Sequence, residues 1–153
     1  MAFDFSKLKA LREETGVSYE LCKKALEETD GNIEKAKKKL LEWGAAAAKK
    51  KSTRTTSQGG IYSYTHHNKK IVALVEIKCE TDFVAANENF QLLGTEIAMQ
   101  VASTQPTDIK ALMNEDYIRD PKKKISDLIK EAILQLGENI EVARITRWEL
   151  GEK

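Results

Sequence analysis

Residues 77–87 read Ile-Lys-Cys-Glu-Thr-Asp-Phe-Val-Ala-Ala-Asn, and this stretch decides the fold. The run from Ile71 to Ile77 is dense in β-branched and aliphatic side chains, which predicts a strand leading into the stretch. Beyond it, apolar residues recur at helical spacing, at Phe90, Leu93, Ile97 and Val101. Residues 77–87 are therefore predicted to form a strand-to-helix turn.

The first residues of the expected helix have two distinct properties. Thr81 is a good N-cap, and Asp82 places a negative charge in the first turn, where the helix dipole favours it. Phe83 then stands at the helix tip, beside a carboxylate and close to solvent. Its ring has two interpretations: it folds back onto the sheet as core, which is the default for such a sequence, or it is a rigid plug for a partner's pocket.

Composition limits the class of protein. A chain of 153 residues has room for one moderate domain, or for a small domain and a larger one. Lys and Arg number 25 and Asp and Glu 24, a balance that argues against a protein built mainly to coat nucleic acid or an anionic membrane. No apolar run approaches the roughly 20 residues needed to span a bilayer.

The N-terminus and the cysteines indicate a cytosolic protein. Residues 1–6 include an early acid and no long apolar segment, so they are not expected to be a signal peptide. Cys22 and Cys79 lie far apart in sequence, and we interpret both as reduced thiols.

Residues 4–43 are predicted to form three short helices. Ser6 and Ser18 are candidate N-caps, Gly16 ends the first helix, and Gly44 is expected to follow the third as its C′ residue. The expected inward side chains are Leu8, Leu11, Leu21, Ala25, Leu26, Ile33, Ala36, Leu40 and Leu41. Residues 1–44 are thus predicted to be a compact bundle like the ubiquitin-associated fold, close to the lower size limit for independent stability.

Residues 45–60 are predicted to be a basic linker, helical at its alanine end. A solvated tether is favoured over contact with RNA.

From Ile61 the apolar period changes to two, which predicts an antiparallel hairpin with its turn at Asn68 and Lys69. Helices are expected near 87–103, 108–113 and 125–136, with an irregular stretch through Tyr117 and Pro121 and a third strand over 142–150. Residues 61–153 are therefore predicted to be an α+β core domain, a three-stranded antiparallel sheet with helices on one face.

Three motifs carry a family resemblance. Residues 79–84 (Cys-Glu-Thr-Asp-Phe-Val) are similar to the signature of the elongation factor Ts family. Residues 11–16 and 22–26 resemble its N-terminal motif, and 136–140 (Leu-Gly-Glu-Asn-Ile) its late core motif. The motifs occur in the family's order across nearly the whole chain. Many members carry two copies of the core module, whereas this chain carries one.

The resemblance implies a translation elongation factor that acts as guanine-nucleotide exchange factor for the GTPase elongation factor Tu. Asp82 and Phe83 would reach the GTPase beside its Mg²⁺ and phosphate site, and Thr81 and Val84 would support the turn. The inserted ring would displace an element of the partner, so that magnesium and diphosphate are lost.

The resemblance also implies that the N-terminal bundle binds the nucleotide domain of the GTPase. The residues carried over by motif are Lys9, Leu11, Arg12, Lys23 and Lys24, and His67 is added as a contact candidate near the hairpin tip. Tyr19 and Glu20 depart from the family pattern, in which two methionines are common. Taken singly, Leu11 could instead be core and the lysines solvated.

Several kinds of site are not expected. The chain has no phosphate-loop motif and no Gly-x-Gly-x-x-Gly, so it should not bind nucleotide itself, and it has no nucleophile elbow. His66 and His67 should point to opposite faces of a strand, and the cysteines lack metal spacing. No cofactor, metal or catalytic residue is therefore predicted. An enzyme using His66, His67, Glu80 and Asp82 is disfavoured because these groups show no convergent spacing.

The partner expected from the resemblance is elongation factor Tu. Three strands leave open sheet edges, and the core is present once, so we expect a homodimer through sheet edges or faces and hence a 2:2 complex. The alternative function is an adaptor that docks a chaperone, ribosome or nascent chain without exchange activity. No membrane or specific nucleic-acid partner is expected. The expected location is the bacterial-type cytoplasm, with a mature organellar protein as the alternative.

Overall fold

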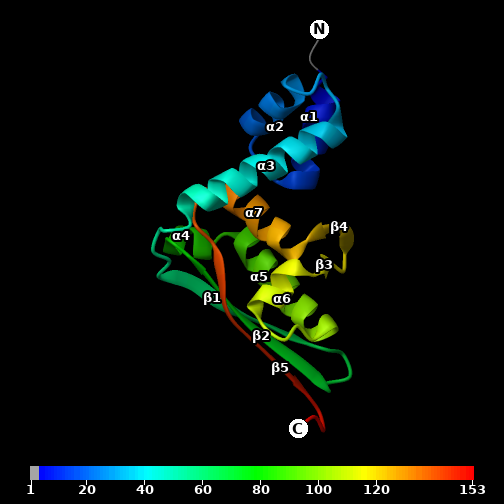
Figure 1. The fold of residues 1–153 in the computed structure, drawn as a ribbon, viewed down its shortest axis with the longest axis vertical. Helices are drawn as coiled ribbons and strands as arrows, with labels where there is room; N and C mark the ends of the chain where they lie inside the picture. Colours follow the sequence, from blue (N-terminus) through cyan, green and yellow to red (C-terminus); the bar gives the residue numbers. More distant parts are fainter. Residues whose placement is uncertain (1–3) are drawn as a thin grey trace.

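The computed structural model describes residues 4–153. Its N-terminal part consists of α1 (Phe5–Thr15), α2 (Tyr19–Glu27) and α3 (Ile33–Lys51), which pack around a small apolar core (Figure 1). Residues 1–3 of the predicted bundle lie outside the described residues.

The caps of these helices explain where each one starts. Ser18 accepts a hydrogen bond from the Leu21 amide, as predicted, and Asn32 accepts one from Lys35. The cap of α1 is Asp4 and not Ser6, because the Asp4 carboxylate accepts from the Ser6 amide at 2.9 Å. An aspartate at this position also places negative charge at the positive end of the helix dipole.

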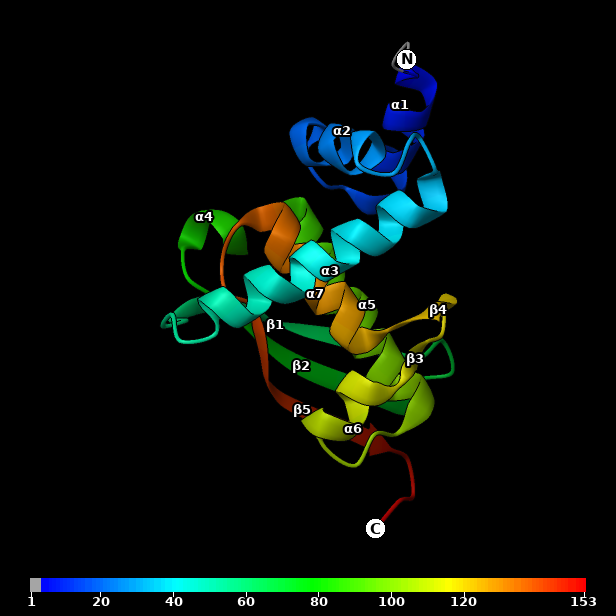
Figure 2. The same ribbon diagram turned by 45° about the horizontal axis from the view of Figure 1, so that its top comes forward.

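Helix α3 does not end at Gly44, as the sequence had suggested, but continues to Lys51. Gly44 is buried, and a Cβ there would lie 2.9 Å from the carbonyl oxygen of Lys130 in α7 (Ile125–Leu136). The glycine therefore serves close helix–helix packing instead of ending the helix. Ala47 and Ala48 extend the same contact against the larger core, and Figure 2 shows α3 crossing over α7.

The segment after α3 is bonded to the core. The Asn139 side-chain amide donates to the Arg54 carbonyl oxygen at 2.9 Å, and the buried Thr56 hydroxyl donates to Glu141 at 2.5 Å. Residues 52–57 are thus held in place over part of their length. The division of the chain into 1–44, 45–60 and 61–153 stays a prediction.

The main sheet contains β1 (Gln58–Thr65), β2 (Ile71–Cys79) and β5 (Glu141–Glu149), in the order β1-β2-β5 with antiparallel neighbours. Helix α5 (Glu88–Thr104) packs on one face of it, which confirms the predicted α+β class. The residues that β2 buries under α5 are Ala73, Val75, Ile77 and Cys79.

The stretch predicted to be irregular contains a short hairpin. After α6 (Ile109–Asn114), β3 (Asp116–Tyr117) pairs with β4 (Asp120–Lys124). The buried Gln100 of α5 donates to the Asp116 carbonyl oxygen at 3.1 Å and accepts from the Ile118 amide at 3.0 Å. The local pattern missed the hairpin because a distant side chain supplies these bonds.

The two cysteines lie in different hydrophobic clusters. Cys22 is buried among the N-terminal helices and Cys79 beneath α5. Burial raises the pKa of each thiol, which keeps both protonated at neutral pH. Among the described helices, none is both long and apolar enough to cross a bilayer.

The contact between α5 and the hairpin gives a test of the fold. Gly94 is buried in α5, and a Cβ there would lie 2.2 Å from a ring carbon of Tyr62. Gly94→Ala should lower the free energy of unfolding by about 1–3 kcal/mol, because this overlap outweighs alanine's helix propensity. Urea denaturation would measure the change, with Gln91→Ala at an exposed position of the same helix as the control. A more stable Gly94→Ala protein would contradict the packing described.

Candidate partner-binding site

The predicted strand-to-helix turn is present. Strand β2 ends at Cys79, and the short helix α4 (Asp82–Ala85) follows with Thr81 as its N-cap. The Thr81 hydroxyl accepts a hydrogen bond from the Val84 amide at 3.3 Å. Val84 is partly buried against the core, so the turn is fixed on its inner side while its outer side faces solvent.

Phe83 faces that solvent side. Its exposed fraction is 85%, and the neighbouring Asp82 is also exposed. The default interpretation, in which the ring folds back onto the sheet, is therefore wrong. An exposed aromatic ring on a capped helix start is available to a partner without any rearrangement of the chain.

The base of the turn is held by Glu138, in the loop between α7 and β5. One oxygen of its carboxylate accepts from the backbone amides of Glu80 at 3.1 Å and Thr81 at 3.0 Å. The other accepts from the Thr81 hydroxyl at 2.7 Å. A single side chain thus satisfies three donors at the point where β2 leaves the sheet.

Glu80 in turn contacts the loop that carries Glu138. Its carboxylate accepts from the Asn139 amide at 2.8 Å and lies 3.6 Å from the Arg54 guanidinium. Glu80 is part of the frame that supports the turn.

The basic residues predicted for the bundle lie on its surface. Lys9, Arg12, Lys23 and Lys24 are exposed on α1 and α2, whereas Leu11 is fully buried in the bundle core. In this conformation Leu11 therefore cannot contact a partner directly and can only support the surface of α1 and α2 from inside the bundle.

Two of these cations lie over aromatic rings. The Arg12 guanidinium is 4.2 Å from the ring centroid of Tyr19, and the Lys24 ammonium is 5.2 Å from that of Trp43. The half-exposed Tyr19, which departs from the family pattern, is thus held flat under a charged group. Lys9 and Lys23 lie near the carboxylates of Glu13 and Glu27, at 3.9 and 3.8 Å.

The structure does not bring the bundle residues and Phe83 into one pocket. Both ribbon views place α1 and α2 beside the N-terminal half of α3 and α4 near its C-terminal end (Figures 1 and 2). A partner that touches both must therefore be large enough to extend along α3, as a folded protein is and a small ligand is not.

His67 lies at yet another place. Strands β1 and β2 pair from Gln58 with Cys79 to Thr65 with Val72, so the hairpin tip is roughly 25 Å from the turn at about 3.4 Å per residue. Its role as a contact stays a prediction.

The two histidines do not point to opposite faces, as the sequence had suggested. β1 ends at Thr65, so they belong to the turn, and their ring centroids are 4.2 Å apart. The Tyr64 hydroxyl lies 3.2 Å from Nδ1 of His66. In residues 4–153, no group of three or more His, Cys, Asp or Glu side chains could hold a metal ion.

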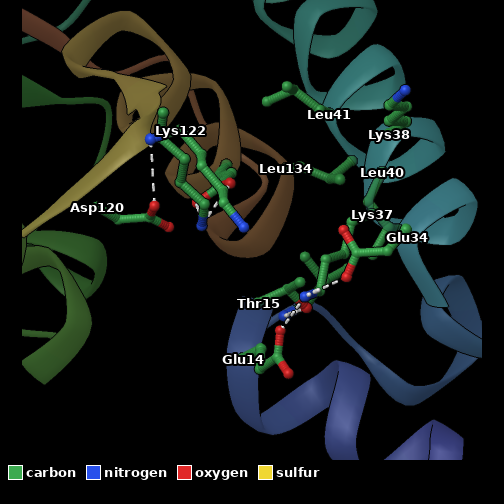
Figure 3. A pocket seen from close by; sticks show the side chains of 13 residues that line it. Glu14, Thr15, Glu34, Lys37, Lys38, Leu40, Leu41, Asp120, Lys122 and Leu134 are labelled. Atoms are coloured by element: carbon green, nitrogen blue, oxygen red, sulfur yellow. Dashed lines mark hydrogen bonds and ion pairs between the residues drawn. The ribbon is translucent and has the colours of Figure 1, made fainter. Parts of the chain in front are cut away.

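A cavity of about 510 Å³ lies between the N-terminal helices and the core (Figure 3). Its charged side chains neutralise one another: Lys37 pairs with Glu14 and Glu34, and Lys123 pairs with Glu131 at 3.0 Å. Burial raises the pKa of Glu131, an effect that Lys123 partly offsets. None of the residues predicted to bind a partner lines this cavity, so we do not assign the site to it.

Comparison with known proteins identifies the family. The family model described as Elongation factor TS matches residues 80–153, which include the turn and its Glu138 support. Proteins called Elongation factor Ts from Coprothermobacter proteolyticus and Maridesulfovibrio salexigens are each 40% identical over 99% of this chain and 100% and 96% of their own lengths. The protein of that name from Thermotoga neapolitana is 37% identical over the whole of both chains. The chain belongs to the elongation factor Ts family.

Membership makes this chain a translation elongation factor. Within that family context, the residue that sequence reasoning missed is Glu138. The Leu-Gly-Glu-Asn sequence around it resembles a core motif of the family, but nothing local links residue 138 to residues 80 and 81. The three hydrogen bonds that its carboxylate accepts assign it to the turn.

The cap predicts how the turn responds to substitution. Thr81→Val removes both the acceptor for the Val84 amide and the donor to Glu138, so the free energy of unfolding should fall by about 1–2 kcal/mol. Thermal or urea unfolding would measure this. Thr81→Ser keeps the hydroxyl and should stay close to wild type, and equal losses in both variants would mean that the hydroxyl does not support the turn.

Proposed function

We propose that this chain is a guanine-nucleotide exchange factor that binds elongation factor Tu and promotes release of GDP. In this proposal Phe83 and Asp82 insert beside the Mg²⁺ and phosphate site of the GTPase, and Thr81 and Val84 hold the turn that carries them. The observation that supports it best is the 85% exposed Phe83 ring on a capped and hydrogen-bonded turn. Membership of the elongation factor Ts family supplies the partner.

Such a factor needs no catalytic group of its own. It must bind the GTPase more tightly when nucleotide is absent, and by linkage the nucleotide is then bound more weakly by the same factor. A rigid aromatic side chain suits this task, because it buries a large apolar surface and loses little conformational freedom on binding. We therefore propose displacement by an inserted ring, and not an enzymatic reaction.

In this proposal the N-terminal bundle provides further binding contacts with the GTPase. Lys9, Arg12, Lys23 and Lys24 present positive charge on α1 and α2, and Arg12 with Tyr19 adds a flat, partly apolar contact surface. Leu11 would contribute indirectly, by filling the core beneath them. Because these bundle contacts are separate from Phe83, the factor could stay bound to the GTPase while the Phe83 ring enters and leaves its site.

We further propose that two chains associate through the outer face of the main sheet, giving a 2:2 complex with the GTPase. This face lies opposite α5, and its register places Val72 beside Trp148 and Leu74 beside Thr146. On this face the exposed fractions of Ile61 and Trp148 are 64% and 78%, and Leu150, directly after β5, is 75% exposed. Two such faces could pack as a sandwich and remove this surface from water.

We place the protein in the bacterial cytoplasm, where translation takes place. The bacterial origin of the similar proteins supports this location.

The proposed insertion of the Phe83 ring is tested by Phe83→Ala. Release of fluorescently labelled GDP from elongation factor Tu should be accelerated by the wild-type chain. In the variant that acceleration should fall by about 30-fold, as expected for losing an anchor worth roughly 2 kcal/mol. Its melting temperature should hardly change, because the ring is exposed.

Ile118→Ala is the matched control, since Ile118 is also an exposed apolar residue but lies on the β3–β4 hairpin. Full exchange activity in Phe83→Ala would rule out the proposed role of the Phe83 ring. Binding of the wild-type chain without any acceleration would favour the adaptor function instead.

The dimer is tested by Trp148→Glu. A charge on a buried apolar face is costly, so the variant should sediment as a monomer at concentrations where the wild type sediments as a dimer. Ile118→Glu places the same charge off this face and should leave the dimer intact. A monomeric wild type at high concentration would overturn the proposed association.

A further inference from the structure

We propose that Glu138 is a positioning residue for nucleotide exchange, which sets the direction in which Phe83 is presented. The inference rests on the proposed function and adds to it a residue outside the turn. Its basis is that one carboxylate accepts three hydrogen bonds from the two residues immediately before α4. The predicted contact residue to which Glu138 is hydrogen-bonded is Thr81, so Glu138 acts through the turn.

The amides that Glu138 accepts lie beyond the end of the sheet. The last paired residues of β2 are Lys78 with Glu141 and Cys79 with Gln58, so the ladder offers no partner to the amides of Glu80 and Thr81. An ionised carboxylate has about four acceptor positions and makes stronger hydrogen bonds than a neutral acceptor. Glu138 therefore continues the strand's hydrogen bonding for two residues past its end.

Glu138 also fixes the orientation of the capping hydroxyl. Thr81 donates its hydroxyl proton to Glu138 at 2.7 Å, and this leaves the oxygen lone pairs free to accept from the Val84 amide at 3.3 Å. Without the carboxylate the hydroxyl could rotate and the cap would be held less well. The first turn of α4, and with it Phe83, thus depends on a residue 57 positions further along the chain.

The loop that carries Glu138 is hydrogen-bonded to two other segments of the chain. Glu80 accepts from the Asn139 amide, so residues 80 and 81 are cross-bonded to residues 138 and 139. Asn139 is buried, and its side chain donates to the carbonyl of Arg54 after α3. Three separate segments of the chain therefore meet at the base of α4.

A helix of four residues cannot maintain its own direction, because helix formation needs several turns before it becomes favourable. If Glu138 is removed, the turn should remain attached to β2 but sample several directions. Only the fraction of molecules with Phe83 correctly presented could then insert it. The limiting rate of exchange should fall in proportion to that fraction, while attachment through the bundle is unaffected.

The test compares Glu138→Ala with Glu115→Ala. Glu115 accepts hydrogen bonds from Gln100 and Thr104 and lies beside β3, which both ribbon views place away from α4. Each substitution removes a hydrogen-bonded carboxylate from the core domain, but only the first touches the turn. Release of labelled GDP from elongation factor Tu is measured over a range of concentrations of each chain, which separates the limiting rate from the half-saturating concentration.

We expect Glu138→Ala to lower the limiting rate about tenfold and to change the half-saturating concentration less than about twofold. Hydrogen exchange of the Thr81 and Val84 amides should become faster in the free variant, which reports the turn directly. Glu115→Ala should leave both kinetic values and these amides unchanged. Glu138→Gln keeps an acceptor for the two backbone amides, so its rate should lie between wild type and Glu138→Ala.

A wild-type limiting rate in Glu138→Ala, or an equal loss in Glu115→Ala, would overturn the positioning role. Should Glu138→Ala fail to fold, a wild-type rate and wild-type amide protection in Glu138→Gln would overturn it as well. Failure of the proposed function looks different, because the wild-type chain would then not accelerate GDP release at all. In that case the amide-exchange comparison still decides whether Glu138 holds the turn.

Discussion

The hydrogen bonding between residues 80 and 81 and residues 138 and 139 is the constraint on which the exposed ring depends. An aromatic side chain at the tip of a short helix is useful to a partner only if its base cannot move. Here the support comes from the core, since the sheet, the α7–β5 loop and the segment after α3 all meet beneath α4. The apolar contact of α5 with the sheet holds these parts together.

The elements with strong local signals were predictable from sequence. Alternation predicts β1, β2 and β5, helical spacing predicts α5 and α7, and the residue type of Thr81 at a helix start predicts an N-cap. These succeed because hydrophobic periodicity and capping are encoded within a few residues. The α+β class followed from the order of the elements.

The remainder depends on contacts between distant residues. Gly44 looked like the end of a helix, but α7 packs against it and the helix continues. The β3–β4 hairpin depends on Gln100, and the role of Glu80 depends on Asn139. Phe83 had two interpretations that local sequence could not separate, because exposure is a property of the whole fold. The roles of individual residues toward a GTPase came from the family resemblance and not from spacing.

Helix α3 is a single element of 19 residues, roughly 28 Å long at 1.5 Å per residue. One half belongs to the N-terminal helices, and the other half lies against α7 and the core. Because α3 is continuous, no loop between its two halves can act as a flexible hinge. Tilting α1 and α2 against the core would therefore require α3 to bend or its close contact with α7 at Gly44 to break.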